Sequence, residues 1–256
     1  MTRHIIVTGA TSPLGSLIVR RLHGRGDHVI AVGRDADRLA AAVNPEVRTV
    51  VADLSTPDGA ADVVAKTDRV DALVNVVGAS DRGLIEELTD DEALRLFDTN
   101  VLTTLRMCRA AAGPLKSSRG VVVNIGSIAG KVGARYIGGY AIAKHGLAGL
   151  TQQLRLEWRE RGVHVGTVSP GPIRRDDAGR RYADRMTATE APDVASAPGG
   201  GTKLRGLDPE RVVDAVARIL DRRTPDIILP GYLRYLIAAG HLNPRLGDWL
   251  LLRFSR

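Results

Sequence analysis

The chain has 256 residues, of which 44% are hydrophobic and 25% charged, so it is long enough to bury one full α/β core. Its single cysteine, Cys108, excludes an intrachain disulfide framework and any metal site built from several cysteines. The formal net charge of +7 comes mostly from arginines scattered among acidic residues, which favours a solvated surface or a phosphate-bearing ligand over nucleic acid.

The apolar runs of the chain are all short. None approaches the roughly 20 residues of a membrane span, and the N-terminal residues enter a strand-like segment without the features of a signal peptide. We therefore expect a cytoplasmic protein.

Strand-like and helix-like segments alternate from residue 3 to about 169. Strands are expected at 5–8, 29–32, 47–52, 72–76, 121–125 and 164–168. Amphipathic helices are expected at 14–24, 36–42, 58–65, 90–112 and 141–160. This alternation predicts a Rossmann-type α/β fold, in which a doubly wound parallel sheet of about seven strands carries helices on both faces.

The pattern changes after Pro170. Residues 174–206 are polar and rich in glycine and proline, which predicts a substrate lid or a disordered segment. A helix near 209–222 and a strand near 226–229 follow.

The tail 231–256 has apolar residues at helical spacing, interspersed with arginines. We interpret it as a helical extension of a single domain that spans 1–256. The favoured interpretation is that it packs on its own core or on a second subunit. The alternative is an apolar, basic-edged wall for a lipophilic substrate or a membrane surface.

The first strand ends in the stretch VTGATSPLGSLIV, a glycine-containing turn followed by a helical stripe. Such a turn directs backbone N–H groups and the positive end of a helix dipole at a phosphate. Pro13 stands between Gly9 and Gly15, where the middle of three glycines usually lies. With Ser12 as N-cap, Pro13 would be the first helical residue, and the amides of Leu14 and Gly15 would still face the phosphate. The turn therefore predicts dinucleotide binding.

The end of the second strand bears on the choice of cofactor. An acidic residue usually meets the free ribose 2′-hydroxyl of NAD(H) at this position. Here Gly33 leaves space and Arg34 can pair with a 2′-phosphate, so NADP(H) is preferred. The nearby Asp35 and Asp37 keep NAD(H) as the alternative.

The third and fourth strands also end in candidate ligand-binding residues. Asp53 and Leu54 follow the third strand and could hold the edge and face of an adenine, and the stretch NVVG, from Asn75 to Gly78, ends the fourth. These positions lie at the C-terminal ends of strands, which form the ligand side of an open α/β sheet.

Three reactive side chains lie in the stretch GSIAGKVGARYIGGYAIAK. Tyr140 and Lys144 are four residues apart on an expected helix and so share one face. A phenol has an unperturbed pKa of about 10, and a nearby ammonium group lowers that pKa toward neutrality. Tyr140 would then act as an acid–base group. Ser127, at the end of the fifth strand, could donate a hydrogen bond to a substrate oxygen.

Several motifs occur together, in one order and spacing, across residues 4–173: TGATSPLG, DL, NVVG, FDTNV, NIGSIAG, YAIAK and SPGPI. In this ordered set the sequence resembles the short-chain dehydrogenase/reductase family, in its single-domain branch. Two departures stand out. NVVG lacks the second Asn and the Ala of the family pattern, and Arg175 stands where the family usually has a Thr near the nicotinamide. We expect Arg175 to contact the cofactor pyrophosphate or an anionic substrate.

The resemblance implies a Ser–Tyr–Lys–Asn tetrad. Tyr140 would be the acid–base residue, and Lys144 would bind the nicotinamide ribose and lower the tyrosine pKa. Ser127 would orient the substrate carbonyl, and Asn100, in FDTNV, would hold a water relay linked to the lysine. The implied reaction is hydride transfer between nicotinamide and a carbonyl carbon, or the reverse oxidation of a secondary alcohol, without a metal. The candidate cofactor-binding residues are Gly9, Thr11, Ser12, Leu14, Gly15, Arg34, Asp53, Leu54, Asn75, Gly78, Tyr140, Lys144, Pro170 and Ile173.

We therefore expect an NADP(H)-dependent oxidoreductase acting on a lipophilic carbonyl or alcohol. By resemblance, the helices at 90–112 and 141–160 would form a homodimer or homotetramer. One alternative is a non-catalytic NAD(P)-binding sensor or scaffold, against which the presence of all four tetrad residues argues. The other is an epimerase or dehydratase, which usually has a larger C-terminal substrate domain.

Overall fold

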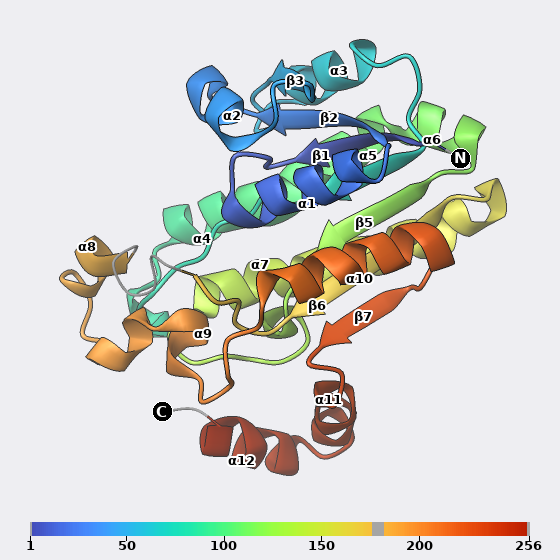
Figure 1. Ribbon diagram of the computed structural model, residues 1–256. Helices are drawn as coiled ribbons and strands as arrows, with labels where there is room; N and C mark the ends of the chain where they lie inside the picture. The colour runs from blue at the N-terminus through green and yellow to red at the C-terminus, as the bar shows by residue number, and fades with distance from the viewer. Residues whose placement is uncertain (1, 176–181, 255–256) are drawn as a thin grey trace.

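A single parallel sheet organises the chain. The computed structural model describes residues 2–175 and 182–254 (Figure 1). The sheet has seven strands in the order β3-β2-β1-β4-β5-β6-β7, and every pair is parallel. The strands are β1 (His4–Thr8), β2 (His28–Gly33), β3 (Arg48–Val51), β4 (Ala72–Asn75), β5 (Val121–Ile125), β6 (His164–Pro170) and β7 (Asp226–Leu229). The predicted Rossmann-type fold is confirmed.

Helices cover both faces of the sheet. One face carries α1 (Pro13–Gly24), α2 (Ala36–Ala42) and α10 (Pro209–Arg222). The opposite face carries α3 (Pro57–Ala65), α5 (Thr103–Ala110), α6 (Ala112–Ser118) and α7 (Gly138–Trp158). Along β1, Ile5 and Val7 pack on the first face and Ile6 on the second, and all three are fully buried. The strands are therefore continuous apolar runs, because both faces of a parallel sheet are covered.

The expected helix at 90–112 is interrupted. The structure has α4 (Asp90–Phe97), then a π-helical turn at Asp98–Leu102, then α5. The Asn100 side chain donates from Nδ2 to the Leu96 carbonyl at 2.9 Å, and Thr99 donates from Oγ1 to the Arg95 carbonyl at 2.8 Å. These side chains occupy carbonyls that a regular helix would offer to backbone N–H groups, which accounts for the wider turn.

The segment expected to lack structure contains short helical pieces. Among residues 182–206 lie α8 (Ala183–Met186), a 3₁₀ turn at Asp193–Ser196 and α9 (Pro198–Gly201). Gly199, Gly200 and Gly201 all have positive φ, at 68°, 67° and 80°, which only glycine adopts readily. Part of the predicted lid, 176–181, lies outside the described residues.

The C-terminal tail forms two helices, α11 (Leu233–Leu242) and α12 (Pro244–Phe254), beyond the β7 edge of the sheet (Figure 1). The tail is tied to its own chain at two places. His241 Nε2 lies 2.7 Å from the Lys131 carbonyl, and the Lys203 N–H donates to the Phe254 carbonyl at 2.8 Å. Many of its apolar side chains nevertheless stay exposed, and Leu242 is the most exposed of them at 88%.

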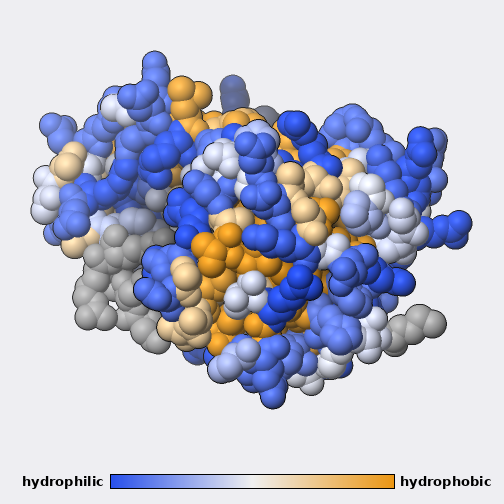
Figure 2. All heavy atoms as spheres, turned by 90° about the horizontal axis from the view of Figure 1, so that it is seen from above, coloured by the Kyte–Doolittle hydropathy of each residue, from blue (hydrophilic) through white to orange (hydrophobic). Residues whose placement is uncertain are grey.

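The surface agrees with the scattered charge of the sequence. On the face shown in Figure 2, hydrophilic side chains surround a central apolar area. None of the helices in the described ranges is both long and apolar enough to cross a membrane.

Candidate active site

A cavity of about 300 Å³ opens at the C-terminal ends of the central strands. It lies where the strand order reverses between β1 and β4, the usual ligand position in open α/β sheets. Its lining includes Ser127, Tyr140 and Lys144 from the predicted tetrad, and Ser12, Pro13, Leu14, Gly78, Pro170, Ile173, Arg175 and Tyr182. The fold thus brings residues from distant parts of the sequence to one site.

Lys144 is almost fully buried, with 4% of its surface exposed. Its Nζ donates to the Ile125 carbonyl at 3.0 Å and lies 5.6 Å from the centre of the Tyr140 ring. Burial lowers the pKa of Lys144 from its usual 10.5 to about 8, because the charged form loses solvation. Lys144 can therefore gain and lose a proton close to neutral pH.

Tyr140 differs from the expectation. Its pKa is raised, chiefly because burial disfavours the phenolate, and the charges of Tyr182 and Asp81 act in the same direction. A hydrogen bond with Ser127 and the charge of Arg82 lower the pKa but do not outweigh burial. The predicted net lowering by Lys144 is wrong for this arrangement, because desolvation dominates and the ammonium is bonded to a backbone carbonyl. Tyr140 therefore keeps its proton at neutral pH and is ready to donate it.

The carbonyl reduction that the resemblance implies should slow above about pH 8, because Lys144 would then lose the proton that it would pass toward Tyr140. Below that pH the ammonium form dominates, and above it the amine. A pH profile of kcat/KM for reduction, at saturating cofactor, should show an apparent pKa near that of Lys144. A Lys144→Arg variant, which holds its charge, should lack this inflection. An unchanged inflection in the variant would assign it to another group.

Asn100 lies in the π-helical turn and is fully buried. Its Nδ2 donates to the carbonyls of Ala79 and Leu96, at 3.0 and 2.9 Å, whereas its buried Oδ1 has no hydrogen-bond partner. A Cβ placed on Gly78 would lie 2.8 Å from this Oδ1 and 3.4 Å from Lys144 Nζ. Gly78 therefore keeps a space between the two polar groups, which suits the relay that the resemblance implies.

Ser12 and Pro13 begin α1 as the sequence predicts. Ser12 is the N-cap, with its Oγ accepting from the Gly15 N–H at 3.0 Å and donating to the Gly9 carbonyl at 2.8 Å, and Pro13 is the first helical residue. One expectation needs correction. The Gly15 N–H is bonded to Ser12 Oγ, so the amide of Leu14, also in the first turn of α1, is the better candidate for a phosphate. Gly15 is required for another reason, since a Cβ there would lie 2.2 Å from the Gly9 carbonyl oxygen.

Asn75 does not direct its side chain into the cavity. It donates from Nδ2 to Asn124 Oδ1 at 2.9 Å, and Asn124 donates in turn to Thr151 Oγ1 at 2.9 Å. These buried groups join β4, β5 and α7, so the role of the Asn75 side chain is to brace the sheet. Cys108 lies at 3.7 Å from Asn75 Nδ2, and burial raises the pKa of its thiol to about 12, in keeping with a packed residue.

The candidates for the adenosine end lie on the neighbouring strands. Arg34 is exposed just after β2, and Asp53, close enough to feel its charge, follows β3. The pKa of Asp53 is lowered chiefly by the hydrogen bond from the Ser55 N–H. The carboxylate of Asp35 accepts from the Arg38 N–H at 2.9 Å and so caps α2. Leu54, also after β3, is buried.

The turn after β1 meets the end of β2 at Thr11. A Cβ on Gly33 would lie 2.9 Å from Thr11 Cγ2. Gly33 is therefore needed for this close approach, which gives a packing reason for the glycine at the end of β2.

Sequence reasoning missed two residues of the site, Asp81 and Arg82. The Asp81 carboxylate accepts from the N–H groups of Gly139 and Tyr140, at 2.8 and 3.1 Å, and so holds the start of α7. Arg82 is 6% exposed, lines the cavity, and lies 3.8 Å from the centre of the Tyr182 ring. The available signal was an acidic and a basic residue side by side in the loop that follows β4.

The residues of the cavity fit a dinucleotide cofactor. The Leu14 N–H lies at the positive end of α1, Arg175 is a basic residue of the lining, and Pro170 and Ile173 give an apolar surface. The unpartnered Oδ1 of Asn100 beside Gly78 adds a polar atom within the site.

The chain matches a known protein family. The model of the short chain dehydrogenase family matches residues 3–185, so the chain belongs to the short-chain dehydrogenase/reductase family.

The chain is also similar to individual proteins of known name. Over 179 residues the chain is 36% identical to a protein named as a ketoacyl reductase of the granaticin polyketide synthase of Streptomyces violaceoruber. The aligned region covers 65% of this chain and 66% of that relative, so it spans slightly under two-thirds of the relative's length. A 3-oxoacyl-acyl-carrier-protein reductase of Vibrio cholerae is 30% identical over 220 residues, covering 83% and 87% of the two chains. A short chain dehydrogenase from Burkholderia cenocepacia, solved in complex with NADP, has a TM-score of 0.79 at 25% identity and covers 100% of this chain and 98% of its own.

Proposed function

We propose that the protein transfers a hydride between NADP(H) and the carbonyl or secondary alcohol of a lipophilic small molecule. The observation that carries this proposal is the cavity that brings Ser127, Tyr140 and Lys144 together beside the N-terminus of α1. Retention of these groups argues against a non-catalytic sensor or scaffold on the same fold.

In the proposed reduction, the substrate oxygen accepts hydrogen bonds from Ser127 and Tyr140. A nicotinamide cofactor, when bound, would supply the hydride that the carbonyl carbon accepts. Tyr140 donates its phenolic proton to the oxygen, and its raised pKa means that this proton is present at neutral pH. Lys144 is the adjacent group that returns a proton toward Tyr140, and the charge of Arg82 stabilises the phenolate formed during transfer.

The preference for NADP(H) rests on Arg34 and Asp35. Arg34 is exposed at the end of β2, where a 2′-phosphate would lie, and the Asp35 carboxylate is already engaged as the cap of α2. The NADP-bound relative supports this choice. NAD(H) stays the alternative.

Replacing Arg34 by Ala should raise the KM for NADPH about tenfold or more and leave the KM for NADH unchanged. A charge-assisted hydrogen bond of about 1.5–3 kcal/mol accounts for this size of effect. Initial rates with each cofactor, on the same carbonyl substrate, provide the measurement. Equal changes for the two cofactors would show that Arg34 does not meet a 2′-phosphate.

Two surfaces support proposals about partners. The first surface consists of exposed apolar side chains on α4 and α7, which support a homodimer or homotetramer. These are Leu94 (67% exposed), Phe97 (36%), Ile142 (54%) and Leu156 (61%). The second is the outer side of α11 and α12, where exposed apolar residues alternate with basic ones, which supports peripheral contact with a lipid surface. A cytoplasmic location remains a prediction from the sequence.

A panel of carbonyl compounds tests the proposed function. The panel should run from small ketones to steroids and long-chain ketoacyl thioesters, each assayed with NADPH and with NADH. We expect reduction of at least one class, with a preference for NADPH. If every carbonyl is inert and the corresponding alcohols are not oxidised either, the proposed function is wrong.

A further inference from the structure

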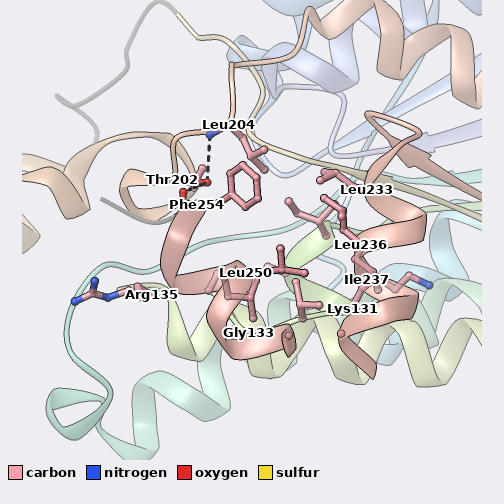
Figure 3. A pocket seen from close by; sticks show the side chains of 18 of the residues that line it. Lys131, Gly133, Arg135, Thr202, Leu204, Leu233, Leu236, Ile237, Leu250 and Phe254 are labelled. Carbon is pink, nitrogen blue, oxygen red and sulfur yellow. Dashed lines mark hydrogen bonds between the residues drawn. The ribbon is translucent and has the colours of Figure 1, made fainter. Parts of the chain in front are cut away.

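A second cavity, of about 470 Å³, lies between the C-terminal helices and the segment after β5 (Figure 3). Its size is within the range of about 300–1,000 Å³ that is usual for small-molecule sites. Leu236 of α11 and Leu250 and Phe254 of α12 point into the same space. Ala129 and Val132, from the segment after β5, also line it. The packing of the tail on the core therefore leaves an apolar chamber unfilled.

This chamber adjoins the catalytic cavity. Pro172 and Gly199 line both. Ile128 and Ala129, which line the chamber, follow Ser127 directly in the chain. The boundary between the two cavities thus includes a glycine, which has no side chain, and a proline ring, and a Cβ on Gly199 would lie 2.8 Å from that ring.

Arg135 and Asp248 line the chamber and are exposed, whereas three further polar residues of its lining are engaged within the protein. Lys131 Nζ pairs with Asp226 at 2.8 Å, His241 Nε2 lies 2.7 Å from the Lys131 carbonyl, and His145 Nδ1 lies 2.8 Å from the Ala141 carbonyl. These groups hold the helices in place, so what the chamber offers a ligand is mainly apolar contact. That chemistry suits a hydrocarbon chain and disfavours a charged head group.

We propose that the chamber binds the unbranched hydrocarbon tail of the substrate whose carbonyl lies at Ser127 and Tyr140. The inference rests on the proposed function and narrows its substrate to aliphatic carbonyl compounds with a long tail. The close crossing of α11 and α12 shapes the chamber, since a Cβ on Gly240 would lie 3.0 Å from the Gly247 Cα. The helices are therefore part of the substrate site and not only a packed extension.

A chain-length series tests the proposal on the full-length protein. The substrates are 2-alkanones from 2-butanone to 2-undecanone, assayed at saturating NADPH. Each methylene that enters the chamber should raise kcat/KM by up to about fourfold, mainly through KM, until the chamber is filled. A flat series would overturn the tail site and leave the proposed reductase intact. A protein inactive with every ketone would overturn both.

A pair of matched variants locates the effect. Leu236→Trp fills the chamber from α11 and should lower kcat/KM for 2-undecanone at least tenfold while leaving that for 2-butanone unchanged. Leu242→Trp introduces the same side chain at an 88% exposed position of the same helix and should change neither value. Thermal unfolding of both variants checks that the fold is intact. A Leu250→Trp variant, which fills the chamber from α12, should repeat the selective loss for 2-undecanone. If Leu236→Trp lowers the rates for both ketones equally, the chamber does not hold the tail.

Discussion

Replacing Tyr140 by Phe should lower kcat/KM for carbonyl reduction by at least about 100-fold, since a positioned proton donor contributes roughly 10²–10⁴ to a rate. The variant removes one oxygen and keeps the ring that packs in the cavity wall. The loss should appear in kcat, because the proton is transferred only in the chemical step. Initial rates on the best substrate of the carbonyl panel provide the measurement.

The control for this variant is cofactor binding. NADPH titrated into the Tyr140→Phe protein, followed by the fluorescence of the cofactor, should give a Kd within a fewfold of the unchanged chain. A variant that keeps full activity would show that another group donates the proton. Arg82 cannot fill that role, since a guanidinium does not give up its proton in proteins.

Replacing Gly15 by Ala should abolish cofactor binding and destabilise the fold by about 3 kcal/mol. The new methyl group would lie 2.2 Å from the Gly9 carbonyl oxygen and 2.9 Å from Ser12 Oγ. Both contacts belong to the turn that begins α1, so the helix N-terminus must shift or the cap must break. Thermal or denaturant unfolding and NADPH titration measure the two effects.

Gly24 offers a matched control at the other end of the same helix. A Cβ on Gly24 meets no atom within 4 Å, so Gly24→Ala should leave NADPH binding unchanged and should stabilise the protein slightly, by up to about 1 kcal/mol. If Gly15→Ala binds NADPH as well as Gly24→Ala does, the α1 turn is not the phosphate site.

The helices and strands could be predicted because the burial of their faces requires a characteristic spacing of apolar residues within each segment. The helix at 36–42 and the strands at 121–125 and 226–229 occur with the expected bounds. Strands buried on both faces are uninterrupted apolar runs, and amphipathic helices have a period of their own. Pro13 at the start of α1 was predictable for the same kind of reason, since its preference for the first helical position is local.

The features that escaped prediction depend on contacts between distant segments. Asn100, in the π-helical turn at Asp98–Leu102, also donates to the Ala79 carbonyl, which is 21 residues away. Asp81 acts on the start of α7, 58 and 59 residues further along the chain. The pKa of Tyr140 was misjudged because sequence spacing indicates a nearby ammonium and says nothing about desolvation, which is the larger effect. The spacing of apolar residues in 231–256 predicted helices but not the chamber beneath them.

The buried hydrogen bonds around α7 also restrict movement of this helix. Asp81 fastens its first turn, and Thr151, through Asn124, anchors its middle to the sheet. Sliding or tilting the helix would break both attachments and leave buried polar atoms without partners, at a cost of about 1–3 kcal/mol each. Tyr140 and Lys144, which lie on α7, are therefore held in fixed positions relative to the sheet. The lining at Tyr182 and Gly199, by contrast, belongs to segments that contain only the short helices α8 and α9, and in the described part of the chain these are not fastened to the sheet in the same way.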